Sequence, residues 1–453
     1  MDRKSTSIPL TYGQLSVWRV IANWPRDRWP ETYLSSTLTV PVDSSVRQTV
    51  EAFAVLCRRH ESLRTHFADT PEGPVQRVAA AGAPVHVAVV ERSGATEAEA
   101  MALGRDQGRD PIDRETDFGR RFTVVTDGGR PVHAVLLVDH IVADGVGLRR
   151  LRSELNALLG SADLEGSRWL RETPAKPREL ALHQRSESGQ SRREAALAYW
   201  GRLLDTVPAG LFPVPEEAGG TPGRIEAVLH SPKARQALIT IARQRRVSPH
   251  TVLLALSSVV TAAATGSTRV VLTLQAGNRF IEPWRSIVSS MNQYAPLPLT
   301  VRPEQGTFTD YVGYVQGAAL NAYRFASYDF DAVAELVRRE RGAALEFDHF
   351  YNFLPENLDD RPNDSADGTA GWIEPTVPNR QIGPRLDIKI RNGPDMPIVI
   401  RTDPGLLPRP SLHQVLAWYE TQLCRLAADG GVPLAEVVRD CERAIDRRIG
   451  SMS

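Results

Sequence analysis

The sequence predicts an α+β fold that is divided into two lobes of similar type. At 453 residues the chain is long for a single hydrophobic core. Helical and strand patterns are mixed in both halves, without the repeating βαβ rhythm of a parallel sheet. A polar stretch with prolines, residues 171–193, has the composition of a crossing between lobes. We therefore expect one lobe over residues 1–175 and a second over residues 176–453.

The first half contains three clear local patterns. Residues 44–60 carry apolar side chains at helical spacing behind two serines, which predicts an amphipathic helix. Two apolar runs, 121–127 and 131–140, flank a Gly-Gly-Arg turn and predict a β-hairpin. Residues 146–160 place four leucines on one helical face. The hairpin therefore leads directly into a helix.

The second half continues the mixture of helices and strands. A helix is predicted over 193–205, and residues 248–266 form a long apolar helix that we expect to be buried. Further strands are predicted over 224–230, 269–277, 297–301, 347–353, 385–390 and 397–402, with helices over 233–246 and 411–428.

Charge, apolar runs and cysteine content argue against several classes of protein. The formal net charge is +0, which does not favour a broad surface for nucleic acid or anionic lipid. The N-terminal residues lack the apolar region of a signal peptide, and no apolar run has the length of a membrane span. The three cysteines are scattered and suggest neither a disulfide framework nor a metal site. We expect a cytoplasmic protein.

One short stretch, VDHIVADGVGL at 138–148, combines groups that can carry chemistry. Side chains alternate along a strand, so Asp139 and His140 should face different environments. An imidazole can accept a proton near neutral pH. After Asp144, Gly145 permits close approach of the backbone at a helix start, where N–H groups can stabilise an oxyanion.

Two other interpretations of this window must be weighed against catalysis. A single histidine at a strand end is more often a hydrogen-bonded structural residue. A metal site built from Asp139, His140 and Asp144 lacks a further histidine or cysteine at suitable local spacing. The motifs GxSxG, GxxxxGK[ST] and HExxH are absent from the sequence. We predict no metal and no cofactor bound by this chain.

The stretch resembles the HHxxxDG signature of the condensation-domain superfamily, the acyl-transfer units of nonribosomal peptide synthesis. Other segments resemble motifs of that family and follow in its order. These are TYGQLSVW (11–18, with Gln14 and Trp18), RRHESLRTHF (58–67), LQAGNR (274–279), SSMNQYAPLPLTV (289–301), GTFTDYVGYV (306–315) and FDHFYNF (347–353). Together they cover the chain from about residue 8 to 430.

The resemblance implies two chloramphenicol-acetyltransferase-like lobes that meet in a V around a tunnel. His140 would be the catalytic histidine within it, and Gly145 would be a backbone donor to the oxyanion. Asp144, paired with Arg279, would hold the loop that carries His140. Asn292 and Tyr294 would line the acceptor side.

The resemblance also implies the partners. An acyl- or peptidyl-carrier protein would deliver the donor on its phosphopantetheine arm, and a small amine or alcohol would accept it. We find no adenylation or carrier region and expect a free-standing monomer. Arg149, Arg150 and Arg152 could meet an acidic carrier, although a solvated helix face is the simpler interpretation.

The chain departs from the signature at its first position, where Asp139 replaces histidine. That position is a supporting one in the family, and a carboxylate facing away from the tunnel needs a cation, for which we expect an arginine. Asp139 and Asp144 also spell the DxxxxD of heterocyclization domains. Gly147 stands where that branch has serine, and His140 is retained where it has none. A non-catalytic recruitment domain and a lipid-alcohol O-acyltransferase remain alternatives.

Overall fold

The computed structural model describes residues 7–22, 24–160, 172–207, 223–354, 371–378, 383–391 and 393–445. The chain forms two compact units. The first contains residues 1–196, 277–293 and 327–332, and the second contains 197–276, 294–326 and 333–453. The predicted boundary between residues 175 and 176 lies inside the first unit. Two segments from the second half of the sequence also belong to this unit.

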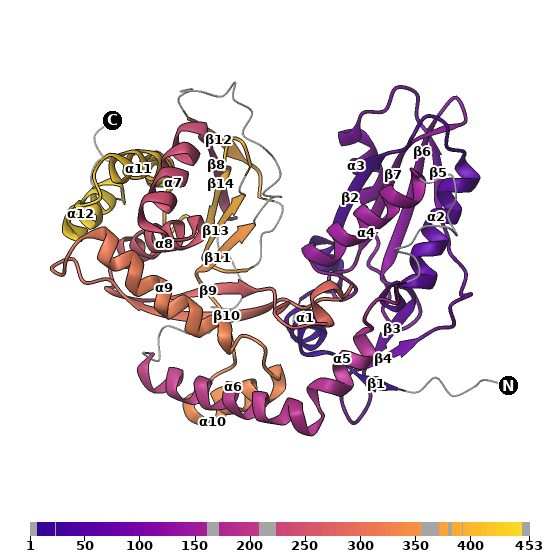
Figure 1. Cartoon of the computed structure of the whole chain (residues 1–453), viewed down its shortest axis with the longest axis horizontal. Coiled ribbons are helices and arrows are strands. Elements are labelled where there is room, and N and C mark those ends of the chain that lie inside the picture. The colour runs from indigo at the N-terminus through magenta and orange to yellow at the C-terminus, as the bar shows by residue number, and fades with distance from the viewer. Residues whose placement is uncertain are drawn as a thin grey trace. The chain divides into compact units, whose positions relative to one another are not determined.

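The first unit is built around a four-stranded sheet (Figure 1). Its strand order is β2 (Leu34–Thr39), β7 (Arg130–Val138), β6 (Arg120–Asp127) and β5 (Ala88–Glu91). The predicted hairpin is β6–β7, an antiparallel pair whose turn uses Gly128 and Gly129 at positive φ. The two inner strands of this sheet are thus β7 and β6.

Helices cover both faces of this sheet. On one face α2 (Val46–Arg59) packs against β6, and the ring of Phe53 stacks on Phe122 with centroids 4.4 Å apart. On the other face α3 (Glu97–Asp106) lies so close to β7 that a Cβ at Gly104 would overlap the Val135 side chain. Burial on both faces explains why β7 is a continuous apolar run rather than an alternating one.

The first unit also contains a second, smaller sheet and further helices. A three-stranded sheet has the order β1 (Ile8–Pro9), β4 (Val75–Val78), β3 (Thr65–Ala68). The helices are α1 (Tyr12–Ala22), α4 (Gly145–Leu159), α5 (Pro177–Gln184) and the first half of α6 (Glu187–Thr206), with short 3-10 turns at Arg26–Thr32, Glu61–Arg64 and Trp284–Ser286.

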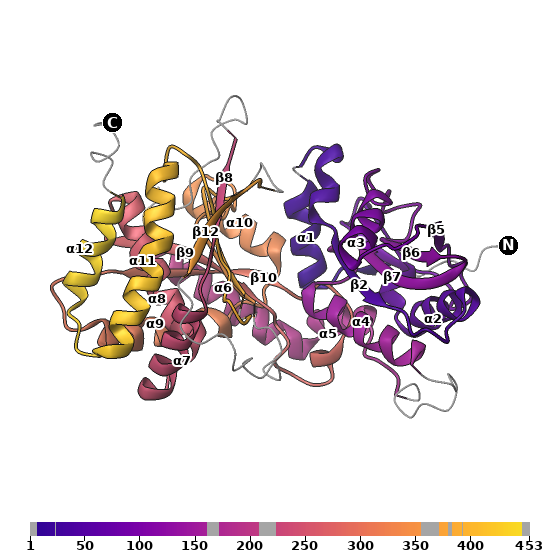
Figure 2. The same cartoon turned by 90° about the horizontal axis from the view of Figure 1, so that it is seen from above.

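The second unit contains a seven-stranded sheet with α7, α8, α9, α11 and α12 gathered on one face and α11 and α12 side by side (Figures 1 and 2). Its strand order is β10 (Gln293–Thr300), β9 (Arg269–Ala276), β11 (Phe350–Leu354), β13 (Leu386–Arg391), β14 (Ile398–Thr402), β8 (Ile225–His230) and β12 (Trp372–Thr376). The helices are α7 (Pro232–Arg245), α8 (Pro249–Thr265), α9 (Phe308–Arg324), α10 (Phe330–Arg341), α11 (Arg409–Ala428) and α12 (Leu434–Ile445). The predicted α+β fold is confirmed.

The apolar helix α8 lies in the core of the second unit, where every residue from Thr251 to Ala262 is buried. Among the described helices, none alone has the length and apolar character to cross a membrane. The pair α7–α8 passes that test of length and composition, but its two helices meet at 110°.

A buried histidine makes the second unit sensitive to acid. His250 is the second residue of α8, and its Nε2 lies 3.0 Å from the Tyr323 hydroxyl. Burial lowers the pKa of His250 to about 4. The unfolded chain therefore binds this proton at a higher pH than the folded chain does, and stability falls as the pH drops below about 6.5. The shift predicts a loss of about 3 kcal/mol between pH 7 and pH 4.

Replacing His250 with glutamine, which keeps an acceptor for Tyr323 but does not titrate, should remove this contribution. We expect the free energy of unfolding of His250→Gln to fall less steeply with acid than that of the wild type. Denaturant titrations at pH 7, 5.5 and 4 measure the difference. Parallel curves for the two proteins would show that His250 is not the acid-sensitive group.

Candidate active site

The segment between β7 and α4 is held by backbone hydrogen bonds on both sides. β7 ends at Val138, and the N–H of Asp139 donates to the carbonyl of Gly119 at 2.9 Å. The Asp139 carbonyl in turn accepts from the N–H of Val142 at 2.9 Å. Three apolar residues, Ile141 to Ala143, are fully buried. The turn is therefore fixed before any side chain of the motif is considered.

Asp139 points into the interior and pairs with an arginine, as its burial requires. Its carboxylate is 0% exposed and receives two bonds from Arg114, from Nε at 2.7 Å and from Nη2 at 3.3 Å. The N–H of Ile141 donates to the same carboxylate at 3.1 Å. The arginine expected beside Asp139 is thus Arg114, which lies 25 residues earlier in the chain.

Aromatic rings enclose the Arg114 guanidinium. Its Cζ lies 4.5 Å from the ring centroid of Trp29 and 5.8 Å from that of Trp18. Tyr33 is also nearby: burial raises its pKa to about 12, and the Asp139 carboxylate adds to the effect. The first position of the motif therefore carries a desolvated ion pair that joins β7 to α1 and to the 3-10 turn Arg26–Thr32.

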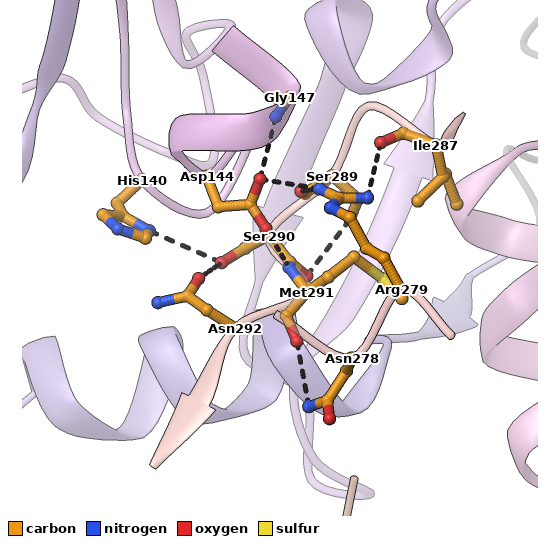
Figure 3. A network of polar contacts seen from close by, with 10 residues as sticks. All are labelled: His140, Asp144, Gly147, Asn278, Arg279, Ile287, Ser289, Ser290, Met291 and Asn292. Atoms are coloured by element: carbon orange, nitrogen blue, oxygen red, sulfur yellow. Dashed lines mark hydrogen bonds and ion pairs between the residues drawn. The ribbon is translucent and has the colours of Figure 1, made fainter. Parts of the chain in front are cut away.

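His140 faces a different environment from Asp139. Its ring is half-buried, and Nδ1 lies 3.4 Å from the hydroxyl oxygen of Ser290 (Figure 3). That hydroxyl donates to Oδ1 of Asn292 at 3.1 Å. The alternation expected from a strand thus persists past the end of β7, and it separates the imidazole from the buried ion pair.

Asp144 joins α4 to the segment that contains Ser290. As the N-cap of α4 it accepts at Oδ1 from the N–H of Gly147 at 2.9 Å. Its Oδ2 accepts from the N–H of Met291 at 3.0 Å, and Arg279 Nη2 donates to Oδ1 at 2.6 Å. The carboxylate is thus shared between a helix start, an ion pair and a second chain segment.

Arg279 ties the other side of this network. Besides Asp144, its guanidinium donates to the carbonyl of Ile287 at 2.9 Å and to that of Ser289 at 3.1 Å. The side chains of Arg279 and Asp144 are only 9% and 5% exposed. The structure therefore contains the ion pair that the sequence predicts, and it shows that the pair also fixes residues 287–291.

Helix α1 approaches the same segment. A Cβ at Gly13 would overlap the carbonyl oxygen of Ser290 and crowd Met291, so only glycine permits this approach. Sequence reasoning missed Gly13, Arg114 and Ser290 as site residues. Gly13 and Ser290 had a signal, since each lies inside a motif named above (11–18 and 289–301), but Arg114 lies outside all of these motifs.

The structure places the other predicted site residues as follows. Gly145 is the exposed first residue of α4, where helix N–H groups lack an intrahelical acceptor. Asn292 is linked to His140 by the Ser290 hydroxyl, which contacts both side chains. Tyr294 belongs to the second unit, where its ring packs on Phe347 and Phe350. Its role in acceptor binding stays a prediction.

The three arginines on α4 differ in their surroundings. Arg150 pairs with Glu154 at 2.8 Å, whereas Arg149 and Arg152 are exposed.

Within the described ranges, no three His, Cys, Asp or Glu side chains are grouped so that they could hold a metal ion.

A lysine at position 279 should weaken this network. Its compact ammonium cannot match the three acceptors that the guanidinium reaches, so we expect Arg279→Lys to lower the free energy of unfolding by about 1–3 kcal/mol. Arg149→Lys, at an exposed position on α4, is the matched control and should stay within about 0.5 kcal/mol of wild type. Chemical denaturation compares them, and equal stabilities would mean that the fork geometry of Arg279 is dispensable.

Comparison with known proteins identifies the family. Residues 8–373 match the family model described as "Condensation domain". The chain belongs to the condensation-domain family. Membership supports a role in condensation-type acyl transfer. Asp139 is the residue of this condensation domain that departs from the HHxxxDG signature.

The relatives of this condensation domain are large synthetases. Nonribosomal peptide synthetase dtxS1 of Metarhizium robertsii is 25% identical over 338 residues, which cover 73% of this chain and 4% of that protein. Cyclosporin synthetase simA of Tolypocladium inflatum is 24% identical over 297 residues, with 63% and 2% covered. The chain thus spans only a small part of the length of these relatives.

Solved structures agree in fold. The first condensation domain of the calcium-dependent antibiotic synthetase, in complex with a substrate analogue, gives a TM-score of 0.66 at 21% identity and covers 96% of this chain and 99% of its own. The X-domain in a complex with OxyB from teicoplanin biosynthesis gives 0.71 at 16% identity, with 96% and 97% covered. At these identities the likeness establishes the fold alone.

Proposed function

We propose that this condensation domain transfers an acyl group from the phosphopantetheine thioester of a carrier protein to an amine or hydroxyl acceptor. The observation that carries the proposal is the way the loop around His140 is held. Its two acidic neighbours in the motif are each anchored by a buried arginine, Asp139 by Arg114 and Asp144 by Arg279. The imidazole between them is half-buried, so it is both held in place and accessible.

The proposed reaction follows from these positions. The acceptor nitrogen or oxygen attacks the thioester carbonyl, which forms the C–N or C–O bond, and the C–S bond then breaks. His140 takes the proton of the attacking group and returns it to the departing sulfur. The N–H of Gly145 at the start of α4 donates to the oxyanion that develops on the carbonyl oxygen.

The phosphopantetheine belongs to the partner rather than to this chain. The substrates fall into two chemical classes, an acyl thioester and a small nucleophile. In this proposal most of the acceleration comes from holding both reactants in contact with His140, since positioning can supply about 7–11 kcal/mol in intramolecular models.

An assay with small thioesters tests the proposal, because such donors replace the carrier protein. Fatty-acyl and aminoacyl thioesters of phosphopantetheine would be incubated with a panel of amines and alcohols, and the products identified by mass spectrometry. We expect an amide or an ester that depends on the enzyme and is lost in His140→Ala. Amide and ester products distinguish peptide-type condensation from alcohol O-acylation, and a thiazoline or oxazoline ring would indicate heterocyclization.

A second candidate is a docking role without catalysis. Two observations favour it: the replacement of the first motif histidine by Asp139, and the likeness in fold to the X-domain, which was solved in a complex with OxyB. This candidate predicts no product from any thioester in the panel. Product formation that requires His140 would exclude it.

A further inference from the structure

Ser290 is a buried hydroxyl that touches the catalytic candidate. It is 0% exposed, and its oxygen lies between Nδ1 of His140 at 3.4 Å and Oδ1 of Asn292 at 3.1 Å (Figure 3). We propose that Ser290 is a positioning residue that sets the tautomer of His140, with its proton on Nδ1 and the lone pair on Nε2. The proposal rests on the proposed function, in which His140 is the base.

The inference follows from counting protons. A serine hydroxyl has one proton to donate and two lone pairs that accept. Oδ1 of Asn292 can only accept, so the Ser290 proton is directed at Asn292. The lone pairs of Ser290 then face Nδ1 of His140. A neutral imidazole carries a proton on only one nitrogen, so Nδ1 is the donor and Nε2 is the basic atom.

The hydroxyl is held too firmly to turn away. Met291, the next residue, donates its N–H to Asp144, and Ser289, the residue before, accepts from Arg279. On the remaining side, the carbonyl of Ser290 lies against Gly13, where no Cβ could fit. The Asp144–Arg279 pair therefore fixes both the loop that carries His140 and the hydroxyl that orients its ring.

The tautomer can be measured directly by NMR. Protein labelled with ¹⁵N-histidine would be studied at a pH where His140 is neutral, and its signals identified among the ten histidines by their loss in His140→Ala. We expect a protonated Nδ1 and an unprotonated Nε2 in the wild type. In Ser290→Ala the population should shift toward the Nε2–H form. A wild-type His140 protonated on Nε2 would overturn the proposal.

Variants at Asn292 test the proton count. Asn292→Ala removes the acceptor, frees the Ser290 proton to face Nδ1, and should raise the Nε2–H population although Ser290 is intact. Asn292→Asp keeps an acceptor oxygen and should retain the Nδ1–H form. Ser289→Ala is the control for loss of a neighbouring buried hydroxyl, because its Oγ contacts the Ser290 carbonyl and not His140. A shift in Ser289→Ala equal to that in Ser290→Ala would also contradict the proposal.

Kinetics then separates this proposal from the proposed function. If both hold, Ser290→Ala lowers kcat by roughly 10- to 100-fold, less than the loss of the imidazole itself, with KM little changed. An inactive His140→Ala with an unchanged tautomer in Ser290→Ala would sink the role of Ser290 and leave the function intact. A shifted tautomer in Ser290→Ala with a fully active His140→Ala would support the role of Ser290 in setting the tautomer and contradict the proposed function.

Discussion

Replacing Arg114 with methionine is expected to lower the free energy of unfolding by about 3–5 kcal/mol, because it leaves the Asp139 carboxylate alone in the interior. The two side chains are 4% and 0% exposed, so water cannot take over the role of the guanidinium. The methionine would also lose the stacking of the guanidinium on Trp29. Denaturant unfolding of the wild type and the variant measures the change.

A double variant distinguishes the unpaired charge from lost packing. Arg114→Met combined with Asp139→Asn removes both charges, and it should recover a large part of the stability lost in Arg114→Met alone. An Arg114→Met protein as stable as the wild type would show that Asp139 does not need its partner. The substitution of aspartate for the first motif histidine would then have no structural explanation in this ion pair.

Replacing His140 with alanine should lower kcat/KM for acyl transfer by roughly 10²- to 10⁴-fold, the usual contribution of a positioned acid–base residue. Stability should change little, because the ring is only half-buried and the loop is held by Asp139 and Asp144. The measurement is the initial rate of amide or ester formation from a phosphopantetheine thioester. Some turnover should persist through positioning of the reactants.

His133→Gln is the matched control for this experiment. His133 lies near the start of the same strand, β7, whereas the motif loop follows its end, and its Nε2 lies 2.9 Å from the carbonyl of Ala95. Its replacement should leave the rate of acyl transfer unchanged. Equal rates for the wild type and His140→Ala would remove the imidazole from the mechanism and leave positioning as its whole basis.

Elements with a strong local pattern were predicted well. The helix expected over 44–60 is α2, the hairpin is β6–β7, and the buried helix over 248–266 is α8. The strand β2 was missed because its sequence, LSSTLT, alternates weakly; it becomes a strand through pairing with β7. Helices α3, α10 and α12 were not predicted either, although the pattern of α12 is strongly amphipathic.

The candidate site could be predicted only in part. The strand-to-helix junction around His140 and the likeness to family motifs were sufficient to predict the pairing of Asp144 with Arg279, 135 residues apart. Ser290 lies in the motif 289–301 but was not predicted, because the sequence does not show which side chain of that segment meets the imidazole. Its importance arises from a distance of 3.4 Å to a ring 150 residues away.

The sequence alone determined the α+β fold, the position of His140 at the end of a buried strand, and the need of Asp139 for a cation. These follow from local periodicity and from the cost of burying a charge. Only the tertiary structure decided that the cation is Arg114, that residues 277–293 join the first unit, and that Ser290 meets the imidazole. Such contacts depend on the path of the whole chain, which no short window of residues contains.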